Sequence, residues 1–145
     1  MPHGRSELIA IVKNGKLSWL ERGEAVDELC QAEPEETVAR LTGLSKETIN
    51  KQRICFRNLQ GTPRDMCRSR KMHADASCRL AHAVSKNPSL NQESVYGRAS
   101  ALSKDRDRER LKKGKDLKGR RTPVGKVTDE DMKTALLEEK YGHNT

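Results

Sequence analysis

Residues 34–59 read PEETVARLTGLSKETINKQRICFRNL, and they predict two short helices joined by a tight turn. The opening proline suits a first helical turn, and the glutamates after it favour the positive end of the helix dipole. Gly43 can adopt the left-handed backbone conformation that ends the earlier helix. Ser45 is a favourable N-cap for the later helix, in which Ile49 is expected to pack back onto Val38. This pattern is typical of a helix-turn-helix.

The later helix is expected to present side chains that contact DNA. On geometry, Asn50 suits adenine, and Lys51 or Arg53 suits guanine. Basic residues beyond the helix are candidates for phosphate contacts, which set affinity and register. Each of these side chains could instead be an ordinary solvated surface group. The predicted DNA-binding residues are Ser45, Lys46, Thr48, Asn50, Lys51, Arg53, Arg57, Arg68, Arg70 and Lys71.

The later helix departs from a regular amphipathic pattern. With Ile49 facing inward, helical geometry places Gln52 or Arg53 on the same face, where an apolar residue is expected. The same geometry points Ile54 outward. We therefore expect the helix to shift or tighten after Gln52.

Composition and charge favour a polyanionic partner. The chain has 145 residues, the usual size of one domain, but only 33% are apolar and 3% aromatic, so its core is small. Residues 40–86 hold eleven basic and three acidic residues, and residues 98–121 hold eleven basic and four acidic residues. Clustered Lys and Arg side chains neutralise phosphates and release their counterions. The net charge of +8 therefore points to nucleic acid.

The periodicity and breaks in the sequence predict an all-α chain with a compact helical domain. Residues 1–15 form an N-terminal segment whose apolar patch could be a short strand or a helix start. The helical domain spans residues 16–102. Residues 103–127, where apolar residues are too few to pack, are expected to form a basic flexible linker or an exposed extension of the preceding helix. Residues 128–145 form a short C-terminal helix and tail, whose apolar stripe could dock on the core or on a protein partner.

Several segments, taken together, resemble the DNA-binding domain of ParB-type partition proteins and related plasmid repressors. Residues 17–25 (LSWLERGEA) look like the helix that opens that domain, and residues 36–49 (ETVARLTGLSKETI) look like its helix-turn-helix. Residues 56–66 and 74–81 are similar to the segments that follow. The resemblance covers about residues 16–90 and implies a site-specific DNA-binding module. The family's N-terminal nucleotide-binding domain and its Gly-Glu-Arg-Arg box have no counterpart here, so CTP binding is not carried over.

The sequence does not predict catalysis. It contains no glycine-rich phosphate loop and no cluster of metal-binding carboxylates. Four cysteines at irregular spacing lack the paired arrangement of a structural zinc site, so they are expected to be reduced thiols in a helical core. We expect no cofactor and no metal. No apolar run is long enough to span a membrane, and the expected location is the cytoplasm, in association with the nucleoid.

These observations predict sequence-specific binding of double-stranded DNA, in a partition-type or transcription-regulatory role. A homodimer is expected, because helix-turn-helix proteins usually bind two half-sites. The alternative is a protein-interaction adaptor whose basic arm binds nucleic acid non-specifically. RNA binding is disfavoured by the few aromatic side chains available for stacking on bases.

Overall fold

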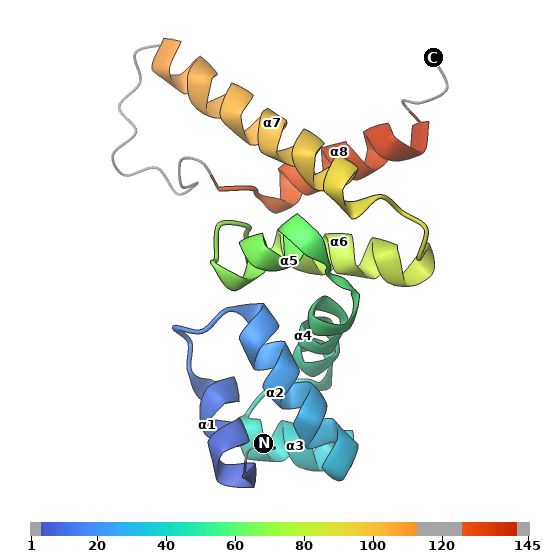
Figure 1. Ribbon diagram of the computed structural model, residues 1–145. Coiled ribbons are helices and arrows are strands. Elements are labelled where there is room, and N and C mark those ends of the chain that lie inside the picture. Colours follow the sequence, from blue (N-terminus) through green and yellow to red (C-terminus); the bar gives the residue numbers. More distant parts are fainter. Residues whose placement is uncertain (1–3, 113–125, 142–145) are drawn as a thin grey trace.

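The computed structural model describes residues 4–112 and 126–141, and all the regular secondary structure in these ranges is helical (Figure 1). The prediction of an all-α fold is confirmed. The helices are α1 (Arg5–Lys13), α2 (Trp19–Ala32), α3 (Glu35–Thr42), α4 (Lys46–Asn58), α5 (Gly61–Arg68), α6 (Ala74–Lys86), α7 (Gln92–Lys112) and α8 (Asp129–Tyr141).

The first four helices enclose a hydrophobic cluster at the N-terminal end of the molecule. Residues 1–15, expected as a separate segment, contain α1, which is a helix and not a strand. Its Leu8 and Val12 are buried within the cluster. Val38 and Ile49 lie in the same cluster, as the sequence pattern predicts, and Leu44 packs against it. The buried members are Leu8, Val12, Ala25, Val26, Leu29, Val38 and Ile49.

The segment between α3 and α4 has the local geometry that its sequence predicts. Gly43 follows α3 with φ of 77°, a left-handed conformation that glycine adopts without steric penalty. The hydroxyl of Ser45 then caps α4 by accepting a hydrogen bond from the amide of Thr48 at 3.1 Å. Helix α3 thus ends at the residue before Gly43, and α4 begins at the residue after Ser45, as the capping preferences of these two residues predict.

Helix α4 stays regular through Asn58, so the expected shift after Gln52 is wrong. Gln52 is fully buried and faces α2 at the point where the two helices come closest. A Cβ atom at Gly23 would overlap the carbonyl oxygen of Gln52, so glycine is what permits this approach. Ile54, expected to point outward, is half-buried and packs against the second hydrophobic cluster.

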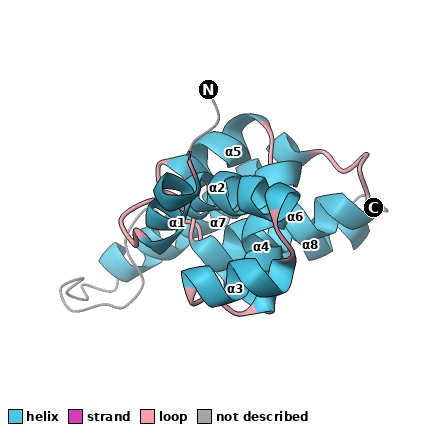
Figure 2. Cartoon of the chain, turned by 90° about the horizontal axis from the view of Figure 1, so that it is seen from below, coloured by secondary structure: helices cyan, strands magenta, loops and turns pink. Residues whose placement is uncertain are grey.

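That second cluster lies among α4 to α8 and includes Leu20 of α2, and α8 crosses the molecule beside α6 and α7 (Figures 1 and 2). Thr128 caps α8 by accepting from the amide of Asp131 at 3.4 Å. Met132 and Ala135 are buried, so the apolar stripe of α8 docks on this chain's own helices. Leu137 is the part of that stripe left 49% exposed.

Helix α7 extends into the region expected as a flexible linker. Its residues 103–112 are helical, and Ser103 and Asp107 are buried. Arg106 binds Asp131 of α8 at 2.6 Å, which ties this extension to the rest of the molecule. Residues 113–125 of the expected linker lie outside the described residues. Within the described part of the chain, every helix is too short or too polar to cross a membrane.

Candidate nucleic-acid interface

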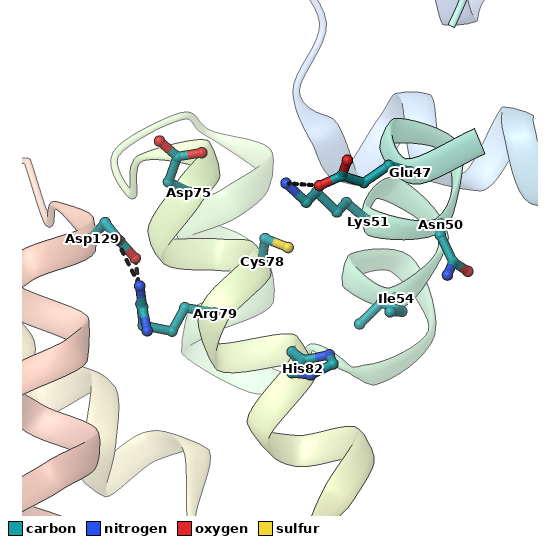
Figure 3. Close-up of a pocket in the computed structure, with 9 residues that line it drawn as sticks. All are labelled: Glu47, Asn50, Lys51, Ile54, Asp75, Cys78, Arg79, His82 and Asp129. Atoms are coloured by element: carbon teal, nitrogen blue, oxygen red, sulfur yellow. Dashed lines mark hydrogen bonds and ion pairs between the residues drawn. The ribbon is translucent and has the colours of Figure 1, made fainter. Parts of the chain in front are cut away.

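Helices α4 and α6 border a groove of about 500 Å³, shown in Figure 3. Ser45 fixes the start of α4, and His73 fixes the start of α6 by accepting from the amide of Asp75. Consecutive turns of the two helices therefore present their side chains to a shared space. The groove is lined by Glu47, Asn50, Lys51 and Ile54 of α4, by Asp75, Cys78, Arg79 and His82 of α6, and by Asp129 of α8.

Asn50 is the amide side chain that α4 offers at this surface. It is exposed and lies in the middle of the helix, one turn after the N-cap. Ser45 and Thr48, which are also predicted DNA-binding residues, are hydrogen-bonded to each other at 3.0 Å and serve the cap. Asn50 can therefore present both a donor and an acceptor to a ligand.

Two predicted DNA-binding lysines on α4 form exposed ion pairs. Lys46 binds Glu36 at 3.2 Å, and Lys51 binds Glu47 at 3.1 Å. The hydrogen bond and charge of Glu47 raise the pKa of Lys51. Exposed ion pairs contribute little to stability, so these lysines can exchange a carboxylate for another anion.

The two predicted arginines of α4 converge on one buried carboxylate. Arg53 Nε and Arg57 Nε each donate to Oδ1 of Asp27 in α2, both at 2.9 Å. The Asp27 side chain is 7% exposed, whereas those of Arg53 and Arg57 are 22% and 53% exposed. Arg53 therefore holds α4 on α2, and Arg57 keeps much of its side chain in solvent.

The remaining three predicted residues lie elsewhere in the molecule. Arg68 ends α5, and Arg70 and Lys71 belong to the loop before α6, so none of them lines the groove. Arg70 has φ of 64°, uncommon for a residue with a side chain, and donates to the carbonyl of Lys16 at 3.0 Å. The ten predicted residues thus form two groups. One lies at the N-cap of α4 and along that helix, and the other lies at the end of α5 and in the loop that follows it.

The groove also contains a thiol that the sequence does not single out. A hydrogen bond from the buried Cys55 thiol lowers the pKa of Cys78 to about 7, and the positive charge of Lys51 acts in the same direction, while burial opposes them. The pKa of Cys55 is raised by the same hydrogen bond and by burial. The two cysteines are 23 positions apart, and only the packing of α4 on α6 brings them together.

Carboxylates share the groove with these cations. Arg79 forms two hydrogen bonds with Asp129, which raise the pKa of Arg79 and lower that of Asp129. Glu47 and Asp75 add further negative charge. The groove is therefore a surface of mixed charge, with recognition groups concentrated on its α4 side.

The groove provides an amide, cations and one thiol of lowered pKa, which are groups that can recognise a ligand. Among the described residues, no three His, Cys, Asp or Glu side chains are placed to hold a metal ion. No family model, no curated protein and no solved structure matches the chain.

Proposed function

We propose that the chain binds double-stranded DNA in a sequence-dependent manner, with α4 lying in the major groove. The observation that supports this most directly is the exposed Asn50 on a helix anchored at both its start and its inner face. Ser45 caps α4, and Ile49 and Gln52 bury its opposite face. A major groove about 12 Å wide admits such a helix.

The roles of the α4 side chains follow from their exposure. Asn50 forms paired hydrogen bonds with an adenine edge, a contact that distinguishes adenine from the other bases. Lys46, Lys51 and Arg57 contact phosphates, which add affinity without reading sequence. Arg53, mostly covered and bound to Asp27, acts by holding α4 in place.

The preceding helix and turn support this assignment. Glu35–Thr42, Gly43 and the Ser45-capped α4 follow one another as in a helix-turn-helix, and these residues carry the resemblance to ParB-type proteins. A partition-type or regulatory role, with a homodimer on two half-sites, is the biological function that we propose. Light scattering, without DNA and with a duplex that the protein binds, tests for the dimer. A monomer under both conditions would exclude it.

Selection of bound duplexes from a random pool tests the proposal. We expect one sequence motif to be enriched. Asn50→Ala should relax the preference at one position of that motif by about 1–3 kcal/mol, the value of one bidentate base contact. Lys46→Ala should weaken binding to every duplex to a similar extent and reduce the salt dependence. Lys104→Ala, an exposed lysine on α7, is the matched control and should preserve the motif.

Two results would contradict the proposal. One is a selection that enriches no motif. The other is an Asn50→Ala variant that binds all duplexes as the unmodified protein does. Both results support instead an adaptor whose basic segment, residues 98–121, binds nucleic acid without sequence preference.

A further inference from the structure

A second cavity lies where α2 and α6 begin, outside the α4–α6 groove. Its volume is about 210 Å³. Four basic residues line it, and none of its described lining residues is Asp or Glu. The basic residues are Arg22, Arg70, His73 and Lys126.

Each basic side chain is held at the cavity by a different element. Arg22 lies in the first turns of α2, behind the N-cap Ser18. Arg70 is placed by its left-handed backbone and its hydrogen bond to the Lys16 carbonyl. Lys126 is placed by its neighbour Val127, whose backbone forms hydrogen bonds with the loop between α5 and α6. Three segments distant in sequence thus place basic residues around one cavity.

The N-terminal ends of two helices add to this charge. Ser18 and Trp19 at the start of α2 and His73 and Ala74 at the start of α6 all line the cavity. Both helices have at least 13 residues, and helix N-termini carry partial positive charge and unpaired amide groups. His73 accepts from the Asp75 amide through Nδ1 at 3.4 Å, so its Nε2–H remains as a donor.

Two of the cations interact unfavourably. Burial and the nearby positive charge of Arg70 lower the pKa of Arg22. Nε of Arg22 is buried and has no hydrogen-bond partner among the described residues. The carboxylates at the two helix starts lie outside the lining: Glu21 accepts from the Ser18 hydroxyl at 3.2 Å, and Asp75, whose side chain is 68% exposed, lies 3.8 Å from Nδ1 of His73. An anion would satisfy Arg22 and remove the repulsion.

We propose that this cavity binds a phosphoryl group. Arginine side chains and helix N-termini are the groups that proteins use most readily for phosphate. The cavity is smaller than the roughly 300–1,000 Å³ that encloses a drug-sized ligand, so it takes the anionic group and leaves the rest of the ligand outside. The group comes either from a DNA backbone or from a small phosphorylated compound. The proposal does not depend on duplex binding by α4.

Titration with inorganic phosphate at constant ionic strength tests the site. Thermal unfolding of the full chain should shift upward with phosphate and saturate, because a ligand that binds the folded state stabilises it. Arg22→Gln and Lys126→Gln should each weaken the apparent affinity at least tenfold. Lys133→Gln makes the same charge change at an exposed site on α8, and it should respond to phosphate as the unmodified protein does.

The variants also separate binding from a structural role. Without phosphate, Arg22→Gln should unfold at a higher temperature than the unmodified protein, because the repulsion by Arg70 is removed; a structural Arg22 would give the opposite shift. If Arg22→Gln fails to fold, Lys126→Gln serves as the test of phosphate binding. Its fold should be kept, because Ser103 and Arg106 contact Lys126 through the backbone carbonyl, which the substitution does not change. The same phosphate response in Lys126→Gln and Lys133→Gln would overturn the proposal.

Competition identifies the source of the phosphoryl group. If a short duplex displaces phosphate from the unmodified protein, the DNA backbone occupies the cavity. If phosphate and duplex bind together, a small phosphorylated compound is the ligand. Failure of sequence-specific binding leaves the phosphate titration unaffected, so the two proposals fail separately.

Discussion

The α4–α6 groove and the second cavity both contain cations, but they differ in how those cations are paired. In the groove, Lys51 binds Glu47 and Arg79 binds Asp129. In the second cavity, the described lining residues include no carboxylate. Net charge along the sequence does not reveal this difference, because residues 40–86 contribute to both sites. What a basic protein can bind depends on which of its cations lack partners.

The difference affects how each site would take up an anion. A duplex that contacts α4 as proposed would displace Glu36 and Glu47 from their lysines, so part of the gain would be offset by the ion pairs that are lost. A phosphoryl group in the second cavity would meet no carboxylate among the described lining residues, with Asp75 3.8 Å from Nδ1 of His73 beside them, and it would relieve the repulsion between Arg22 and Arg70. We therefore expect duplex binding to depend strongly on salt concentration. Phosphate binding should have the more favourable binding free energy per contact.

The largest expected effect would disrupt both sites together. Gly23→Ala places a Cβ atom against the Gln52 carbonyl, and the backbones of α2 and α4 must separate. We expect a loss of about 3 kcal/mol, the upper range for overpacking, measured by denaturant unfolding. Gly97→Ala is the matched control, because nothing lies within 4 Å of its Cβ position on α7. It should stabilise the protein by up to about 1 kcal/mol; equal midpoints for the two variants would exclude close α2–α4 packing.

Next in size is the effect of the buried carboxylate beneath α4. Asp27→Asn removes the partner of Arg53 and Arg57, and breaking a buried pair costs about 3–5 kcal/mol. Because both arginines reach solvent, we expect a smaller loss of about 2 kcal/mol, together with a weaker preference among duplexes as α4 loosens. Glu36→Gln breaks the exposed pair with Lys46 and should leave the unfolding midpoint unchanged. Equal destabilisation by the two variants would contradict the role of Asp27.

Local chemistry explains what could be predicted from the sequence. Gly43 and Ser45 fix the end of α3 and the start of α4 through contacts within a few residues, and both are observed as expected. Ser18 and Thr128 cap α2 and α8 by the same local chemistry. Helix α5 is not predicted, because its first turn contains glycine and proline, which are typical of a break.

Long-range packing explains what could not be predicted. The Asp27 carboxylate meets arginines 26 and 30 positions away. The second cavity combines Arg22, Arg70 and Lys126, whose positions in the sequence share no pattern. The extension of α7 past residue 102 depends on burial against α8, which its charged sequence does not indicate.

A smaller effect should separate the two sites. Gly43→Ala puts a side chain at φ of 77°, which costs about 1 kcal/mol, and it shifts α4 relative to α3. Duplex binding should weaken, while the phosphate response of the second cavity should stay intact. Gly15→Ala, at a position with no positive φ and open space around it, is the control for unfolding measurements. Loss of both activities in Gly43→Ala would show that the sites are not independent.

The smallest effect concerns the electrostatics of the groove. Because the pKa of Cys78 is about 7, its thiolate fraction rises as pH increases through that value, and its alkylation rate should rise with it and then level off. Cys55→Ala removes the thiol donor and should raise the midpoint, and Lys51→Gln should raise it as well. Mass spectrometry at each cysteine gives the rates, with Cys67, whose pKa is raised by burial, as the internal control. An unchanged midpoint in Lys51→Gln would place the lysine outside the groove.

The backbone pairing of Met72 with Val127 has a consequence for the order in which the molecule is built. The segments that form the helices around Val38 and Ile49 are complete once synthesis has passed residue 59. Lys126, which lines the second cavity, is synthesised only 67 residues later. In a nascent chain the residues of α4 are therefore present well before Lys126, and chains that end at about residue 100 should lack the proposed phosphate response.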